Sequence, residues 1–418
     1  MMRGKVRFTH RFLAWPFVLA GMFIGLAGQV AGRPLAAPNA EPSPVEVALD
    51  HYRNLEHDQA QKQLEAWLAQ HPDDLRALNY LATVILQREL LRRELMESQA
   101  YGPKGEAYQP GKPTLPAGFQ EQLFDILGKA ENHAEIRLRK NPRDEEALYW
   151  AGAAHVTRAI FYLSLARSDL KALGEAKEAR NLHARLLAAN SNAVDALLVI
   201  GVYDYVVGKL PWYLKVVASI AGHHGDKDRG LEEIRRVSEQ GHWAREDGKW
   251  FLAILYFGEK RYSEALELLR GLSASYPRNY LLPQEIARAY KSQGDLKSAS
   301  QAYDAMLAKH DDNAPGYRGL PLPKVLYQAG QVRAQMGEFD EALRRFDRAA
   351  KLSENNVFVY RSEFEAAGLC LRMNRREEAR QRYERVVQAI PSSGEARSAR
   401  QALKKLNDSP SPSVTRAK

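Results

Sequence analysis

A repeat of about 34 residues is the feature that most restricts how this 418-residue chain can fold. The four clearest copies are 246–279, 280–313, 323–356 and 360–392. In these copies a small residue is followed four positions later by a large one, as Ala265 is by Leu269 and Ala342 is by Phe346. Apolar residues recur with helical spacing along most of the chain, without convincing runs of alternating β-branched residues. The pattern predicts an all-α fold of stacked helix pairs, because one pair cannot bury its apolar face alone.

The residues at matching positions resemble those of the tetratricopeptide repeat. In the first and third copies they are Leu252, Tyr256, Tyr262, Ala265, Leu269 and Pro277, and Gly330, Phe339, Ala342, Phe346 and Ala349. Small residues let the paired helices approach closely, and large residues fill the space between neighbouring pairs. The resemblance implies a right-handed superhelical solenoid of antiparallel helix pairs with a concave inner groove.

The N-terminal half follows the pattern less closely. Ala60 and Leu64 match in the first copy, and inserts at 99–118 and 209–230 interrupt later ones. The first insert holds four prolines and four glycines, so we expect a loop there. The predicted segments after residue 32 are a Pro-rich linker at 33–44, irregular repeats at 45–245, four regular repeats at 246–392, a capping helix at 393–406 and a disordered tail at 407–418.

A second, local resemblance covers 201–234. This stretch reads GVYDYVVGKLP, then an apolar segment, then GHHGDKDRGLEEI. It resembles part of the tetratricopeptide repeat protein 39 family, which includes a yeast mitochondrial outer-membrane protein. The match supports a shared repeat architecture. It does not place the chain in a mitochondrion, because residues 1–32 have the character of an export signal.

Residues 1–32 have the three-part layout of a secretory signal peptide. Four basic residues precede an uncharged run at 12–28, and Val30 and Gly32 then stand at the −3 and −1 positions of a cleavage site. The stretch 12–32 is also long enough, at about 20 residues per span, to remain as an anchor. The sequence therefore predicts an exported protein, periplasmic or secreted. The alternative is an inner-membrane protein anchored by its uncleaved N-terminal segment.

The composition excludes several classes of function. The chain has 60 Lys and Arg against 51 Asp and Glu, a net charge of +9, and part of this surplus lies in the basic N-terminus. Nucleic-acid binding usually needs a stronger basic footprint, so we expect no nucleic-acid partner. Cys370 is the only cysteine, which rules out an intramolecular disulfide and any multi-thiolate metal or iron–sulfur site.

Motifs that carry catalysis are absent from the sequence. It contains no GxxxxGK[ST], GxGxxG, GxSxG or HExxH spacing. Cys370 falls where this repeat places a buried residue, so we interpret it as a core residue rather than a reactive thiol. The sequence predicts no catalytic residue, no cofactor and no metal site, and we expect that the protein is not an enzyme.

One polar cluster is a candidate cation site: His223, His224, Asp226 and Asp228. Two imidazoles and two carboxylates could hold a divalent cation. Adjacent histidines in a loop point in different directions, however, and glycines on either side break the chain. We therefore favour a turn whose aspartates cap the following helix. Trp212 and Tyr213 could line a ligand pocket, but we favour a role in sealing an irregular helix packing.

The concave groove implied by the repeat is the better candidate site. Its projected lining combines aromatic, amide and cationic residues: Trp250, Ile254, Phe257, Gln284, Arg288, Lys291, Tyr327, Gln331, Gln335, Arg361, Phe364 and Arg372. Such a surface suits an extended protein segment or peptide, with an acidic one favoured by the cations. The leading hypothesis is an exported scaffold, and the resemblance implies a role in bacterial envelope assembly or trafficking.

Two other functions stay open at this point. The first is an enzyme or small-ligand site in 203–230, which would require a cluster of buried, mutually hydrogen-bonded polar residues there. The second is a membrane-tethered adaptor, which differs only in keeping residues 12–32.

Overall fold

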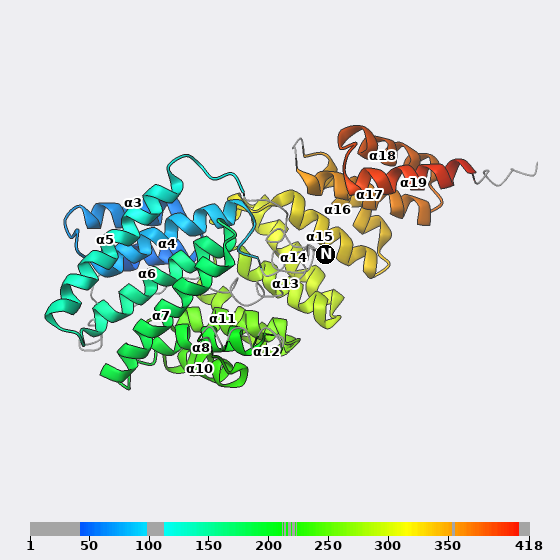
Figure 1. The fold of residues 1–418 in the computed structure, drawn as a ribbon. Coiled ribbons are helices and arrows are strands. Elements are labelled where there is room, and N and C mark those ends of the chain that lie inside the picture. The colour runs from blue at the N-terminus through cyan, green and yellow to red at the C-terminus, as the bar shows by residue number, and fades with distance from the viewer. Residues whose placement is uncertain are drawn as a thin grey trace, which may run out of the picture. The chain divides into compact units, whose positions relative to one another are not determined.

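The computed structural model describes residues 42–97, 113–210, 212, 215, 219, 222, 224–352 and 356–408. Every regular element in this part of the chain is a helix (Figure 1), which confirms the predicted all-α class. The chain divides after Asn279 into two compact units. The predicted signal peptide, nearly all of the linker and most of the insert at 99–118 lie outside the described residues, so these assignments stay predictions.

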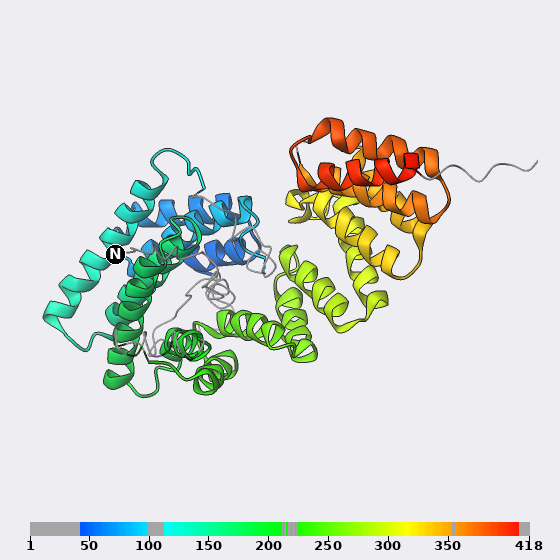
Figure 2. The ribbon, with the colours of Figure 1, turned by 45° about the vertical axis from the view of Figure 1, so that its right-hand side comes forward.

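Five helix pairs make up the described residues of the first unit. They are α2 (Pro44–Arg53) with α3 (His57–Leu68), α4 (Leu75–Arg92) with α5 (Phe119–Lys140), α6 (Glu145–Ser164) with α7 (Asp169–Ala189), α8 (Ala196–Gly208) with α10 (Lys227–Gln240), and α11 (Arg245–Gly258) with α12 (Tyr262–Ser275). The pairs follow one another along an arc, blue to green in Figure 2.

In the second unit, the described residues form three helix pairs and a further helix. They are α13 (Leu281–Gln293) with α14 (Leu296–Asp311), α15 (Leu322–Gln335) with α16 (Phe339–Ala350), α17 (Val357–Arg372) with α18 (Arg376–Ala389), and then α19 (Gly394–Asp408). A short 3-10 helix, Tyr317–Gly319, precedes α15. Each unit is therefore a stack of helix pairs, which confirms the predicted solenoid architecture. The irregular repeats were expected to end at residue 245. The division between the two units lies one helix pair further along the chain, after α11 and α12.

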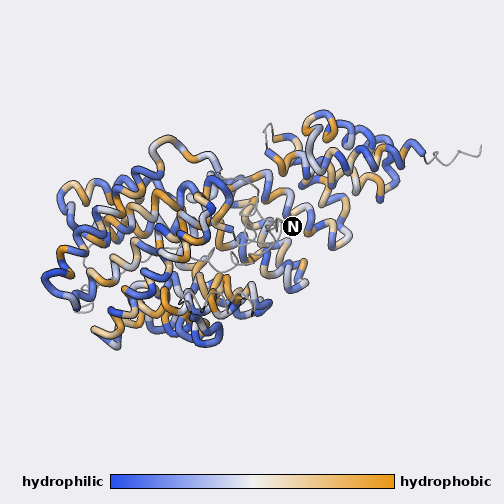
Figure 3. The backbone as a smooth tube through the Cα atoms, viewed as in Figure 1, coloured by the Kyte–Doolittle hydropathy of each residue, from blue (hydrophilic) through white to orange (hydrophobic). Residues whose placement is uncertain are grey.

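The repeat positions form the core between paired helices. The small residues Ala265 and Ala342 have no exposed surface, and Phe346, four residues after Ala342, is also buried. A Cβ atom on Gly330 of α15 would overlap the ring of Phe346, so only glycine lets α15 and α16 pack this closely. Hydrophilic and hydrophobic residues recur in turn along the helices (Figure 3).

Glycines also set the contact between α8 and α10, where the second resemblance lies. Gly201 of α8 and Gly230 of α10 face each other so closely that a Cβ on either would overlap the carbonyl oxygen of the other. Gly208 and Gly225 make a similar close approach at the end of α8. The glycine spacing of 201–234 thus has a structural reason, namely two helices in backbone contact.

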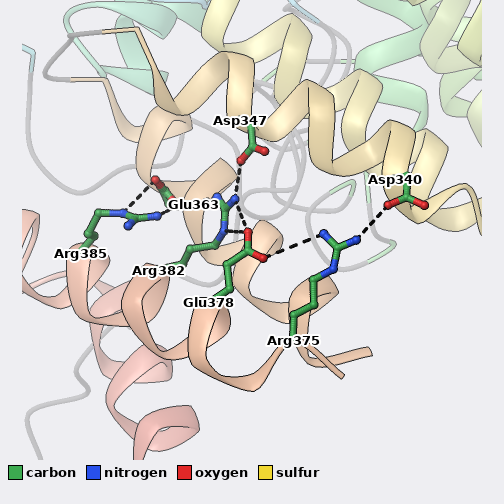
Figure 4. Close-up of polar contacts among 7 residues, drawn as sticks. All are labelled: Asp340, Asp347, Glu363, Arg375, Glu378, Arg382 and Arg385. Carbon is green, nitrogen blue, oxygen red and sulfur yellow. Dashed lines mark hydrogen bonds and ion pairs between the residues drawn. The ribbon is translucent and has the colours of Figure 1, made fainter. Parts of the chain in front are cut away.

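Ion pairs connect α16, α17 and α18 of the second unit (Figure 4). The buried guanidinium of Arg382 lies 2.7 Å from Asp347, 3.1 Å from Glu363 and 2.9 Å from Glu378. Arg385 shares the carboxylate of Glu363 from a more exposed position. One buried cation thus holds carboxylates from three helices.

Three residues singled out in the sequence can be placed. Cys370 is buried among Ala342, Phe346 and Ala379, as a core residue should be. Asp226 caps α10 by accepting hydrogen bonds from the backbone N–H groups of Asp228 and Arg229, as expected for a turn. The expected sealing role of Trp212 is wrong, because its side chain is 78% exposed. Tyr213 and His223 lie outside the described residues.

Candidate partner-binding groove

A cavity of about 290 Å³ opens between α15, α16 and α17 of the second unit. Its lining residues are Gln331, Ala334, Gln335, Phe346, Glu365, Gly368, Leu369 and Arg372. Three of these, Gln331, Gln335 and Arg372, belong to the groove projected from the sequence. The helices present them because Gln331 and Gln335 are one turn apart on α15 and Arg372 ends α17.

Two further projected residues extend this groove through Gln331. The Lys291 ammonium of α13 donates to the Gln331 side-chain oxygen at 3.4 Å, and the Gln331 amide donates to the Tyr327 hydroxyl at 2.7 Å. We call Lys291, Tyr327, Gln331, Gln335, Glu365 and Arg372 together the α15–α17 groove.

The electrostatics of the α15–α17 groove follow from partial burial. Burial raises the pKa of Glu365, although Arg372, Gln331 and Lys291 act in the opposite direction. Burial, with the nearby charge of Arg288, lowers the pKa of Lys291. In the described part of the chain, neither Lys291 nor Arg372 forms an ion pair within 4 Å with a carboxylate. The groove therefore offers two cations and two amides around one carboxylate.

Four projected residues have little exposed surface. Trp250, Ile254, Gln284 and Arg288 are all buried, and the Arg288 guanidinium pairs at 2.5 Å with the buried Glu285. Trp250 and Ile254 belong to the first unit, and Gln284 and Arg288 to the second. In this structure these four side chains contribute to the interior.

The remaining projected residues pack against their own helices or close neighbours. Phe257 lies edge-on to Tyr262, with ring centres 5.4 Å apart, and Phe364 packs similarly against Tyr383 at 5.5 Å. Arg361 pairs with Glu395 of α19 at 2.9 Å. These residues have partners within the fold, unlike the open side of the α15–α17 groove.

Glu365 was missed by the sequence analysis. It follows Gln331 by 34 residues, but the third and fourth predicted copies start 37 residues apart, at 323 and 360, so the predicted register placed Gly368 and not Glu365 at the position of Gln331. Phe364, projected as the counterpart of Tyr327, packs against the core cluster of Tyr383 and Val386 in the structure.

The region proposed as an alternative ligand site does contain buried polar residues. The Asp204 carboxylate has no exposed surface and is paired with Arg180 of α7, at 3.1 Å, and with Arg229 of α10. Because guanidinium groups on two neighbouring helices satisfy this carboxylate, it ties helices together.

A second polar group near this region centres on Glu259, at the end of α11. Its carboxylate accepts hydrogen bonds from Tyr205 at 2.5 Å, Lys209 at 2.8 Å and Lys227 at 2.9 Å. Burial alone would raise the pKa of Glu259, but these hydrogen bonds bring it down to about 2. These contacts also join helices, namely α8, α10 and α11.

In the described residues, no group of three or more His, Cys, Asp or Glu side chains is placed to hold a metal ion. None of the helices described has the length and apolar character that crossing a bilayer requires.

Family models of the tetratricopeptide repeat match three stretches of the chain. One model matches residues 256–320, and another matches 47–99 and 327–394. The last stretch contains the whole lining of the α15–α17 cavity. No curated protein matches the sequence of this chain.

Solved structures with the same kind of fold are distant. A human IFIT1 dimer with m7Gppp-AAAA is 14% identical, covers 88% of this chain and 82% of its own, and superimposes with a TM-score of 0.40. Yeast Tom70 is 14% identical, with coverages of 87% and 89% and a TM-score of 0.35. Pseudomonas aeruginosa pilF is 18% identical, with coverages of 63% and 100% and a TM-score of 0.36.

Proposed function

We propose that this tetratricopeptide repeat protein is a scaffold whose partner, a protein or an extended peptide, binds in the α15–α17 groove. The repeats themselves imply a protein–protein interaction scaffold. The further assignment to this groove is supported by the cavity between α15, α16 and α17, which brings amides and cations from successive helix pairs onto one surface.

The chemistry of the groove favours an acidic segment. Glutamine side chains can donate to and accept from a peptide backbone, which suits an extended chain of any sequence. Lys291 and Arg372 add positive charge that no carboxylate within 4 Å neutralises in the described residues. A carboxylate on the partner would form charge-assisted hydrogen bonds with them, and these are stronger than neutral ones.

Site-specific photocrosslinking tests this assignment. A benzophenone amino acid at Gln335, an exposed residue of the groove, should crosslink to a protein in an envelope extract. The matched control carries the same group at Arg344, an exposed residue of α16. A protein captured from Gln335 and not from Arg344 supports the groove. Capture of nucleic acid instead, or equal capture from both positions, contradicts it.

We also propose that the chain is exported and acts in the bacterial envelope, in assembly or trafficking. The support is the basic, apolar and small-residue layout of residues 1–32. N-terminal sequencing of material from the periplasm or medium should start close to Arg33. Recovery of the intact Met1 terminus in a membrane pellet would favour the anchored adaptor instead.

We propose that the protein has no catalytic role. The support is that the buried polar groups at 203–230, around Asp204 and Glu259, already bind to neighbouring helices. Loss of Asp204 should therefore reduce stability without a separate effect on partner binding at Gln335.

A further inference from the structure

The two ends of the first unit contact each other through side chains of two turns. One turn follows α2, and the other follows α12. Arg278 donates to the carboxylates of Glu56, at 2.9 Å, and Asp50, at 2.5 Å, and its backbone N–H donates to the Asn54 side chain at 3.1 Å. These residues are 222 to 228 positions apart in the sequence. The contacts close the arc of helices into a ring.

Three more contacts strengthen this closure. The Asn279 amide donates to the backbone oxygen of Arg53 at 2.7 Å. The Arg53 guanidinium donates to the Tyr276 hydroxyl at 3.1 Å and lies 5.5 Å from the centre of the Tyr276 ring. We call these seven residues the ring latch: Asp50, Arg53, Asn54, Glu56, Tyr276, Arg278 and Asn279.

The ring latch differs from the other junctions of the first unit in its chemistry. Helix pairs along the arc are joined by buried apolar residues such as Leu64, Leu127 and Ala179. The latch instead consists of charged and polar groups, of which Asn54 and Asn279 are buried, while the ion pair of Arg278 and Asp50 is reached by water, with side chains 30% and 54% exposed. Ion pairs of this kind are weakened by dissolved salt, whereas apolar packing is not.

Arg53 connects the latch to the buried centre of the unit. Burial lowers its pKa, but Asp247, Tyr276 and Tyr80 outweigh this effect and raise it, so these groups surround the guanidinium. Tyr80 and Asp247 are also neighbours of Tyr149 on α6. The same centre therefore includes residues from α2, α4, α6 and α11.

This centre holds polar atoms that the closed ring leaves unsatisfied. The hydroxyl of Tyr149 and the indole N–H of Trp243 are buried and make no hydrogen bond within the described chain. Their rings are in contact, with centres 5.0 Å apart. Buried donors without acceptors destabilise the state that buries them, and contact with water removes that cost. Access of water to this centre would therefore relieve these two groups.

We propose that the ring latch is releasable, so that the first unit exchanges between a closed ring and an open form in which solvent and ligands reach the polar centre around Tyr149. Salt shifts this exchange toward the open form, because the contacts of Arg278 with Asp50 and Glu56 are ionic. The exchange is independent of the α15–α17 groove, since every latch residue lies in the first unit.

Single-molecule energy transfer on the full chain tests the proposal. Dyes are attached at Gln59→Cys on α3 and Glu267→Cys on α12, both exposed, in a Cys370→Ala background. Low salt should give one high-transfer population. Raising the salt from about 0.05 M to about 1 M, where charges are screened within about 3 Å, should add a second, low-transfer population that is absent at low salt.

Arg278→Ala should produce the low-transfer population at low salt, with helix content unchanged by circular dichroism. The matched control is Arg235→Ala, which removes a cation with two exposed ion pairs within α10 of the same unit. It should leave the closed population as in the wild type. If Arg278→Ala does not fold, the salt series on the wild type decides alone. An unchanged single population in the salt series, or in a folded Arg278→Ala variant, overturns the latch.

Discussion

Arg382 and Arg385 share the carboxylate of Glu363 but differ in burial, with side chains 8% and 53% exposed. Arg382→Ala leaves Asp347, Glu363 and Glu378 without their common cation, and loss of one partner from a buried ion pair typically costs about 3–5 kcal/mol. Arg385→Ala removes an exposed pair, for about 1 kcal/mol or less. Urea unfolding of the two variants measures the difference. Equal losses would show that burial does not determine the role of Arg382.

Because His57 and His183 are buried, we expect the free energy of unfolding to fall in mild acid. Burial lowers the pKa of each to about 4. Between pH 6.5 and pH 4 the unfolded chain therefore binds protons that the folded chain does not, so stability decreases as the pH falls through this range. The full effect is roughly 3 kcal/mol for each histidine. Urea unfolding at pH 7, 5.5 and 4.5 should show this loss.

His183→Gln separates one histidine from the other. The variant keeps a polar side chain on α7 but cannot take up a proton, so its stability should fall less steeply with acid than that of the wild type. The same slope in both proteins would mean that His183 does not titrate as its burial requires.

Single residues also show what the sequence could predict. The repeat register placed Ala265, Ala342 and Phe346 in the core, and all three are buried, because spacing alone decides which helix face packs inward. The same register could not show that Arg288 is buried against Glu285. A charged residue at a repeat position has the same spacing whether or not a partner covers it.

At the level of helices, the contact between α8 and α10 depends on two glycines. A Cβ on Gly230 would overlap the Gly201 carbonyl oxygen and come within 2.5 Å of the Tyr205 backbone nitrogen. Gly230→Ala should therefore force the helices apart and destabilise the first unit by about 1–3 kcal/mol, as overpacking does. Thermal or urea unfolding measures the change.

Gly271→Ala is the control for this prediction. Gly271 lies inside α12, and a Cβ there would meet nothing within 4 Å. Because alanine favours helix, the variant should be as stable as the wild type or more stable by up to about 1 kcal/mol. A Gly230→Ala variant that behaves like Gly271→Ala would mean that α8 and α10 do not touch at these glycines.

Helices were predictable from the sequence where the repeat is regular, and less so elsewhere. Residues 322–350 form the two helices that Gly330 and Phe346 indicate, because both helices and their turn fit one repeat. Between Arg92 and Phe119 the chain leaves the repeat, so no periodicity locates the start of α5. The extra segment after Gly208 likewise separates α8 from α10 without a repeat signal.

At the scale of the whole molecule, the division into two units was not predictable. The boundary at Asn279 depends on Arg278 and Asn279 contacting residues 222 to 228 positions earlier. A repeat pattern reports neighbours that are one or two helices apart, and carries no signal for contacts between turns at the two ends of a unit. The ring latch could therefore be found only in three dimensions.

The groove itself was partly predictable. Gln331, Gln335 and Arg372 were projected from repeat positions, and the structure places all three around one cavity. From their repeat positions alone, four cations were expected to line the groove in the same way: Arg288, Lys291, Arg361 and Arg372. In the structure Arg288 and Arg361 already pair with Glu285 and Glu395, so Lys291 and Arg372 are the cations to test.

Calorimetry on the protein captured at Gln335 tests the central claim most directly. Lys291→Ala with Arg372→Ala should weaken its binding by about 2–4 kcal/mol, and wild-type binding should itself weaken as salt rises. Arg344→Ala, which removes an exposed cation of α16 instead, should bind as the wild type does. If the double variant binds as tightly as the wild type at both low and high salt, the α15–α17 groove is not the partner site.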